Sequence, residues 1–276
     1  MKYFVSTINF APKMKEKISD VIPNMIEEGI KNIEISSFHP YEKDLDLKKY
    51  NANILLHNFS PADNNDLLIN LCSPKHSGEV ISFIKRRILL TKELGQDYYS
   101  FHAGFRTDKL GALGMQSNNL GKREAMDRMI QSMKEIVDFA EEKNVHIGVE
   151  NHFCTKEMKD NLILYDTRDW DEFFSKLDSN YLHLHLDVGH LKISANENEF
   201  CPHNFLSYFG HKVKAVHVHD NTGWKVDCHA PFENLWITEN DWRQLNNLDY
   251  VILETRSLCD IKLVNKMINY LGGEND

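Results

Sequence analysis

The sequence lacks paired cysteines and long apolar runs. Its five cysteines are scattered, odd in number and without a Cys-x-x-Cys pair. That usage suits a reducing compartment and argues against a disulfide scaffold. No apolar run approaches the length of a membrane span, and Met1 and Lys2 lead directly into YFVSTINF without an apolar signal region. We therefore expect a cytoplasmic protein with no membrane partner.

Basic residues are also in deficit, with 32 Lys and Arg against 41 Asp and Glu and a formal charge of −9. This balance is not typical of a nucleic-acid coat protein or a membrane-surface binder, although a local basic groove remains an alternative. A chain of 276 residues can form two small domains or one large α/β barrel. Since no linker or low-complexity segment interrupts it, we expect a single domain over residues 1–276.

Short β-rich runs alternate with helical patterns along the chain. The predicted strands are 3–9, 32–36, 53–59, 97–103, 145–151, 181–187, 213–219 and 250–255, and the predicted helices are 13–29, 78–95, 122–144, 167–178 and 260–272. Eight strands separated by helices are the order of a parallel (β/α)8 TIM barrel. A doubly wound open sheet is the rival, and it would normally place a ligand at one switch point.

Side chains that bind metals recur at the ends of six consecutive predicted strands. A TIM barrel gathers the C-terminal ends of its strands on one face, and its sites lie there. Such a series therefore favours a metal site over chance placement. In chain order the candidates are His57, His102, Glu150, Asp187, His190, His217, His219, Asp227, His229 and Glu254.

Alternation within one strand separates two faces. In YLHLHLD (181–187) the leucines share one face, whereas His183, His185 and Asp187 share the other. We expect the leucines to face the helices, and the two histidines to line the barrel interior as hydrogen-bonded or core groups rather than as ligands. Six histidines without a supporting pattern are assigned to surface or packing positions: His39, His76, His146, His152, His203 and His211.

Seven short motifs, in order and at family spacing, resemble the xylose-isomerase-like barrels. They are LLHNF, INL (69–71), SFHAG, GVENH, LHLDVGH, VHVHDNTGWKVDCH and VILET, and they extend from about residue 32 to residue 256. This superfamily includes sugar-phosphate isomerases and epimerases together with the endonuclease IV class of DNA-repair enzymes. The resemblance implies a TIM barrel whose site lies at the C-terminal ends of the strands.

The resemblance also implies a ligand set. The single catalytic metal of the isomerase and epimerase branch falls on Glu150, Asp187, His217 and Glu254. The additional ligands of endonuclease IV, which binds three zinc ions, fall on His57, His102, His190, Asp227 and His229. One ion cannot use nine ligands. We therefore expect two or three divalent ions per chain, Zn²⁺ or Mn²⁺.

Two positions favour the isomerase branch. Ser60 stands where the endonuclease branch has an aromatic residue that probes DNA, and Glu34 resembles the isomerase form of strand two. The leading hypothesis is a metal-dependent sugar or sugar-phosphate isomerase or epimerase, in which Glu150 and Glu254 move a proton through a metal-stabilised enediolate. The alternatives are an endonuclease IV-like phosphodiester hydrolase, whose partner would be nucleic acid, and a non-catalytic sugar-binding barrel.

Three further residues are candidates for holding the substrate. Arg106 and Arg256 carry guanidinium groups suited to a phosphate or a carboxylate, and a salt bridge at the surface is an equally good interpretation of each. His219 lies beside the strand-seven ligand, and we assign it to the substrate as well. The expected partner is a small sugar or sugar phosphate.

Overall fold

The eight predicted strands are present, and they form a closed parallel barrel in the order β1 to β8. The computed structural model describes residues 1–11, 16–37, 39–63, 69–107, 120–223, 225–256 and 260–273. The predicted TIM-barrel fold is confirmed. The strands are β1 Lys2–Ser6, β2 Asn32–Ile35, β3 Asn53–His57, β4 Tyr98–Phe101, β5 His146–Glu150, β6 Leu182–Asp187, β7 Val213–Val218 and β8 Tyr250–Leu253.

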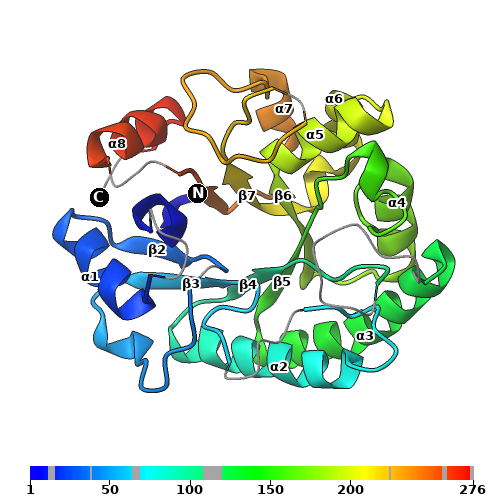
Figure 1. Ribbon diagram of the computed structural model, residues 1–276, viewed down its shortest axis with the longest axis horizontal. Helices are drawn as coiled ribbons and strands as arrows, with labels where there is room; N and C mark the ends of the chain where they lie inside the picture. The colour runs from blue at the N-terminus through cyan, green and yellow to red at the C-terminus, as the bar shows by residue number, and fades with distance from the viewer. Residues whose placement is uncertain are drawn as a thin grey trace.

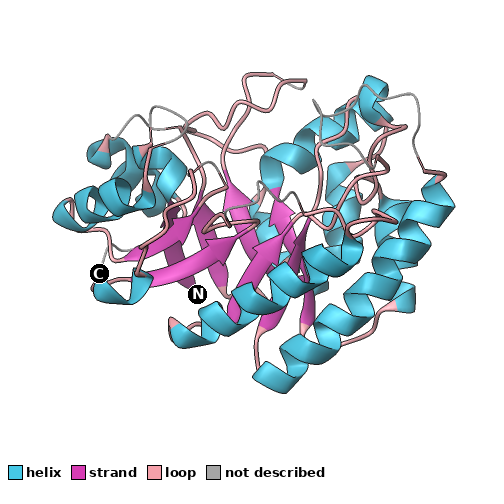
Figure 2. Cartoon of the chain, turned by 60° about the horizontal axis from the view of Figure 1, so that its bottom comes forward, coloured by secondary structure: helices cyan, strands magenta, loops and turns pink. Residues whose placement is uncertain are grey.

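Helices surround this barrel (Figure 1), and the longer loops gather at the end towards which the strands run (Figure 2). In the described part of the chain the α-helices are α1 Ile18–Glu27, α2 Ser77–Glu93, α3 Lys122–Lys143, α4 Thr167–Lys176, α5 Val188–Asn198, α6 Pro202–Phe209, α7 Glu239–Gln244 and α8 Ile261–Tyr270. None of the described helices is both long and apolar enough to cross a membrane.

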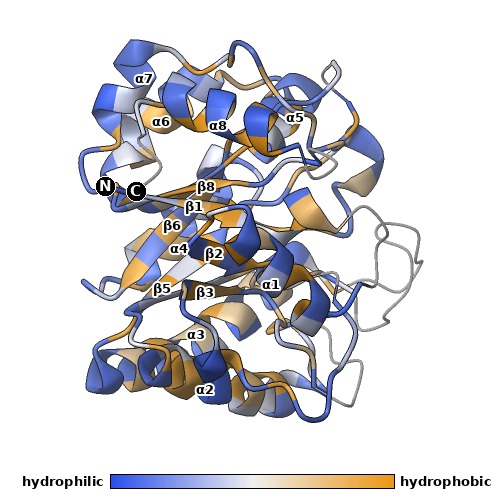
Figure 3. Cartoon of the chain, turned by 90° about the vertical axis from the view of Figure 1, so that its left-hand side faces the viewer, coloured by the Kyte–Doolittle hydropathy of each residue, from blue (hydrophilic) through white to orange (hydrophobic). Residues whose placement is uncertain are grey.

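Most of the buried hydrophobic side chains that the structure describes form two layers. The larger cluster lies between the strands and the helices, and Figure 3 shows hydrophobic residues on the strands and on one side of the helices. A smaller cluster fills the barrel interior with Phe4, Leu55, Tyr98, Ala215, Tyr250 and Ile252. As predicted, the leucines of β6 pack in the outer layer, whereas His185 is fully buried. Its Nδ1 lies 2.9 Å from the hydroxyl oxygen of Tyr98, so it is a hydrogen-bonded core group.

Some predicted boundaries differ from the structure. The run 3–9 divides into β1 and a 3-10 helix, Thr7–Phe10, and part of the predicted helix 13–29 lies outside the described residues. The helices α5, α6 and α7 were not predicted. In α5 nine of the eleven residues are buried, so the helix has no polar stripe to create a helical period. Its N-cap is Asp187, whose Oδ1 accepts a hydrogen bond from the backbone N–H of His190 at 2.7 Å.

Gly148 on β5 permits close packing inside the barrel. A Cβ atom at this position would lie 1.9 Å from the hydroxyl oxygen of Tyr98, the group that contacts His185. We expect Gly148→Ala to lower the free energy of unfolding by about 1–3 kcal/mol, because overpacking forces neighbouring side chains to move. In the control Gly78→Ala the added methyl meets nothing within 4 Å. Urea denaturation measures both, and equal stability of the two variants would contradict the packing argument.

Candidate metal centre

The predicted metal ligands form a cluster, which we call the metal-ligand cluster. Glu150, the last residue of β5, lies at its centre and is 1% exposed. Its Oε2 lies 3.2 Å from Nε2 of His57, the last residue of β3, and 3.3 Å from Nε2 of His102, which follows β4. Its Oε1 lies 3.4 Å from Nδ1 of His190 and 3.5 Å from Nδ1 of His217. Residues far apart in sequence therefore meet because parallel strands end on one face.

His217 on β7 lies beside three further carboxylates in addition to that of Glu150. Its Nδ1 lies 3.0 Å from Oε2 of Glu254, which follows β8, and 3.9 Å from Oδ2 of Asp187, the last residue of β6. Its Nε2 lies 3.1 Å from both carboxylate oxygens of Glu34 on β2. Glu34 thus orients the ring so that Nδ1 faces the centre of the cluster. The sequence marked Glu34 as a branch feature without assigning it to the site.

A loop after β7 brings Asp227 and His229 back to this face. Asp220 and Ala230 form an antiparallel bridge, with N···O distances of 2.9 and 2.7 Å, so the chain between them folds back. The backbone of His229 has a φ of 48°, a conformation uncommon for residues other than glycine. Oδ2 of Asp227 lies 3.1 Å from Nε2 of His229 and 3.2 Å from Nε2 of His190. The structure therefore brings all nine predicted ligands together.

His219 lies under the cluster rather than at the cavity surface. Its Nε2 is 3.0 Å from both carboxylate oxygens of Asp187, and its ring is fully buried. A Cβ at Gly189 would lie 2.1 Å from Cε1 of His219, so a glycine there makes room for the ring. In the described residues His219 is not part of the cavity wall.

Burial and charge act in opposite directions on these groups. Burial by itself would lower the pKa of His217, but the carboxylates of Glu254 and Glu34 raise it well above its ordinary value. Burial also lowers the pKa of His229, but the carboxylates of Glu254 and Asp227 outweigh it and raise this pKa to about 9. Although burial raises the pKa of Asp227, the neighbouring imidazoles lower it well below the usual range. The buried imidazoles and carboxylates thus stabilise one another's charged forms.

Several buried atoms of the cluster suit a divalent cation. Within the described residues, Glu150 Oε2, His217 Nδ1 and Asp227 Oδ1 have no hydrogen-bond partner, although ionisable groups surround them. Imidazole nitrogens and carboxylate oxygens are ligands of zinc and of comparable divalent ions. Glu150, Asp187 and His217 are among the groups whose ligand atoms lie within 4.8 Å of one another. A cation here would give these oxygen and nitrogen atoms the partner that they lack.

A cavity of about 310 Å³ opens above the cluster. Glu150, Glu254 and Asp227 line its floor together with several of the histidines. Apolar side chains form much of the remaining wall: Phe59, Ile69, Phe105, Phe153, Met158 and Leu162. The site therefore combines a charged floor with an apolar wall.

His152 lines this cavity, a role that its sequence pattern does not predict. It lines the wall, and its ring stacks on that of His102 at a centroid distance of 4.5 Å. Its Nε2 lies 3.1 Å from the carbonyl oxygen of Gly104. The only signal in the sequence was its place two residues after Glu150, at the end of a strand that supplies a ligand.

The two candidate arginines lie outside the described cavity wall. The side chain of Arg106 donates hydrogen bonds to the carbonyl oxygens of Leu120 and Lys159, at 3.0 and 3.1 Å. Arg256 is exposed, and its backbone N–H donates to the carbonyl oxygen of His229 at 2.8 Å. The structure therefore does not bring either guanidinium group to the metal-ligand cluster.

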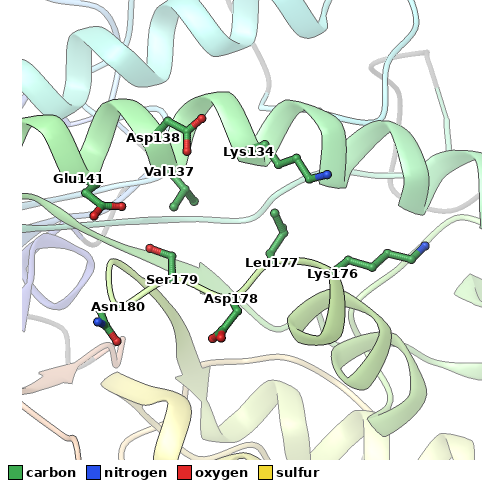
Figure 4. Close-up of a pocket in the computed structure, with 9 residues that line it drawn as sticks. All are labelled: Lys134, Val137, Asp138, Glu141, Lys176, Leu177, Asp178, Ser179 and Asn180. Atoms are coloured by element: carbon green, nitrogen blue, oxygen red, sulfur yellow. The ribbon is translucent and has the colours of Figure 1, made fainter.

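A second hollow lies between α3 and the segment that follows α4 (Figure 4). It is lined by α3 and by the segment that leads from α4 into β6, with residues such as Lys134, Asp138 and Asn180. This segment precedes β6 and therefore lies at the N-terminal ends of the strands, whereas TIM-barrel sites lie at the opposite face. The candidate ligands lie at the other end of the barrel.

Comparison with known proteins identifies the family. The model of the xylose isomerase-like TIM barrels matches residues 25–258. The chain belongs to this family. The resemblance noted from the sequence motifs is thus confirmed. No curated protein sequence matches the chain.

Solved structures of similar fold include three informative relatives. A D-tagatose 3-epimerase-like protein is 20% identical with a TM-score of 0.70, covering 99% of this chain and 96% of that one. D-allulose 3-epimerase from Methylomonas sp., in complex with D-allulose, is 14% identical with a TM-score of 0.67 and coverages of 99% and 96%. The IOLI protein with a binding zinc atom is 15% identical, with a TM-score of 0.67 and coverages of 99% and 98%. At sequence identities this low, the structural likeness establishes a shared fold and nothing more.

Removing the charge of Glu34 tests whether its contact with His217 supports metal binding. We expect Glu34→Gln to weaken divalent-metal affinity by roughly 10–100-fold, because a partner that orients a ligating histidine and increases its basicity is lost. Competition with a chromophoric chelator measures this affinity. Glu27→Gln, the same change at an exposed position of α1, serves as the control. Unchanged affinity in Glu34→Gln would show that the carboxylate does not support a ligand.

Proposed function

We propose that this protein is a divalent-metal-dependent isomerase or epimerase of small sugars. The observation that carries the proposal is the pair of buried glutamates beside one histidine at the floor of a cavity. Nδ1 of His217 lies 3.0 Å from a carboxylate oxygen of Glu254 and 3.5 Å from one of Glu150. Both glutamates line the cavity. Two carboxylates that can both bind a metal and reach a substrate suit the movement of a proton between carbon atoms or faces.

Four residues would hold the ion of this inner site: Glu150, Asp187, His217 and Glu254. A set of three carboxylates and one imidazole suits Zn²⁺ or Mn²⁺. When bound, a divalent ion polarises neighbouring substrate oxygens and makes the adjacent carbon acidic. Asp187 also caps α5 through the N–H of His190, so its carboxylate is oriented by the fold before any ion binds.

Proton transfer would be the work of the two glutamates. One carboxylate removes the proton from the substrate carbon, and the other delivers a proton to the neighbouring carbon or to the opposite face. A general base of this kind contributes about 10²–10⁴ in rate. Glu150 and Glu254 come from different strands, β5 and the end of β8, so a substrate on the cavity floor can contact both.

The cavity favours a small sugar without a phosphate. Its volume of about 310 Å³ is at the lower end of ligand pockets, which span roughly 300–1,000 Å³. Phe105, Phe153 and Met158 on its wall would cover the C–H groups of the substrate, while its hydroxyls face the charged floor. Arg106 is engaged with backbone carbonyls elsewhere. The fold is also that of proteins named as epimerases of D-tagatose type and of D-allulose.

Phosphodiester hydrolysis is the second candidate, and the completeness of the ligand set favours it. His57, His102, His190, Asp227 and His229 surround the inner site with four further imidazoles and a carboxylate. Several close ions can generate hydroxide and stabilise a leaving oxygen. Cleavage of a duplex containing an abasic site, measured beside the sugar assay on metal-loaded protein, separates the two candidates.

Replacing Glu150 tests the proposed proton transfer. We expect Glu150→Gln to lower turnover by about 10²-fold or more, because an amide cannot accept the substrate proton. The measurement is exchange of substrate C–H with D₂O, followed by NMR on a panel of free ketoses. Glu141→Gln, the same change on the exposed face of α3, should match the wild type. Near-normal exchange in a folded Glu150→Gln variant would remove Glu150 from the mechanism.

Metal content tests the proposed number of ions. We expect two or three ions per chain in protein loaded with Zn²⁺ or Mn²⁺, because nine ligands exceed what one ion uses. The variant His229→Ala should lose an outer ion and keep the ion at Glu150 and Glu254. Elemental analysis after gel filtration measures both. One ion in the wild type and in His229→Ala would mean that the Asp227 loop contacts substrate instead.

A further inference from the structure

Three histidines from different elements present the same ring nitrogen to Asp227. Nε2 of His190 on α5 and Nε2 of His229 lie 3.2 and 3.1 Å from its Oδ2, and Nε2 of His219 after β7 lies 4.0 Å from its Oδ1. Ligand atoms of these four residues all lie within 4.8 Å of one another. Three nitrogens and one oxygen at such spacing match the ligand set of a tetrahedral zinc-type site.

The other nitrogen of each ring faces a backbone carbonyl. Nδ1 of His190 lies 2.9 Å from the backbone oxygen of Asn151, and Nδ1 of His229 lies 3.0 Å from that of Glu254. Nδ1 of His219 lies 3.4 Å from the backbone oxygen of Asp220. A carbonyl oxygen can only accept a hydrogen bond, so the short contacts of His190 and His229 favour a proton on Nδ1, and the longer contact of His219 has the same sense. The lone pairs on Nε2 are then left to face the carboxylate. Metal-binding histidines in proteins share this arrangement.

Lone pairs facing a carboxylate require a positive charge between them. Protons could supply it, but the rings are close: the centroids of His219 and His229 are 4.1 Å apart, and that of His190 is about 6 Å from each. Three charged, buried rings at these distances repel one another. One divalent cation satisfies all three lone pairs and the carboxylate at once.

We propose that His219 is the fourth protein ligand of an outer metal ion, together with His190, Asp227 and His229. The proposal rests on the proposed function only in assuming that an ion occupies this part of the cluster. Three imidazoles and one carboxylate would complete a tetrahedral coordination sphere. The outer ion would connect the Asp227 loop to α5, because His190 lies on α5 and both Asp227 and His229 lie on the loop.

A positioning role is the competing account of His219. Its Nε2 also lies 3.0 Å from both oxygens of Asp187, a residue assigned to the inner ion. If His219 only orients Asp187, its loss should weaken the inner ion. If it binds the outer ion, its loss should weaken the outer ion. The two accounts thus differ in which ion is affected.

Cobalt substitution decides between them, because tetrahedral Co²⁺ absorbs visible light far more strongly than five- or six-coordinate Co²⁺. In the full chain loaded with Co²⁺, we expect His219→Asn to lose the tetrahedral absorption of the outer ion and to keep the absorption of the inner ion. The affinity of the outer ion should fall by more than ~100-fold, beyond the usual effect of a residue that only orients a ligand. The exposed His211 provides a control, and His211→Asn should match the wild type.

A second variant keeps the test decisive if His219→Asn does not fold. Cysteine can also bind Zn²⁺ and Co²⁺, so His219→Cys should retain the tetrahedral spectrum and add a sulfur-to-cobalt charge-transfer band. An unchanged spectrum in folded His219→Asn, loss of the inner ion, or absence of the sulfur band in His219→Cys would overturn the proposal. The measurement needs no substrate, so failure of the sugar assay would leave its result intact.

Discussion

The burial of Glu150 among imidazoles is the interaction on which the rest of the site depends. A lone carboxylate at the end of a buried strand would cost several kcal/mol. Here four histidines from β3, β4, α5 and β7 surround it at 3.2 to 3.5 Å. Since each reaches Glu150 from a different element, the register of the whole barrel determines whether the charge is compensated. A cation among these imidazoles would also compensate the charge of this carboxylate.

The floor and the wall of the cavity would contact different parts of a substrate. Charged groups gather on the strand ends, whereas Phe105, Phe153, Met158 and Leu162 come from the loops above them. In a TIM barrel the strands supply a rigid base and the loops set the choice of substrate. The proposed inner and outer ions extend this division, because one faces the cavity and the other would hold a loop in place.

The sequence predicted the barrel well because its strands are short, buried and regularly spaced. Alternation in 181–187 separated the outer leucines from His185 because the Cβ atoms of a strand point to opposite faces. The helices α5 to α7 were missed for physical reasons. Burial on all sides removes the polar stripe from α5, and α7 spans only Glu239–Gln244. Periodicity cannot signal either kind of helix.

The strand pattern of the sequence indicated ten candidate ligands on one face of the barrel, and the resemblance to the family implied nine of them. Only the tertiary structure decided their partners. It directed Arg106 to the carbonyl oxygens of Leu120 and Lys159, and it placed His219 beside Asp187 in the space left by Gly189. The position of a residue along a strand specifies whether its side chain points into the barrel or towards the helices, and how close it lies to the C-terminal end of the strand. Ring orientation and the pairing of charges depend on contacts between residues far apart in the chain, which no local pattern records.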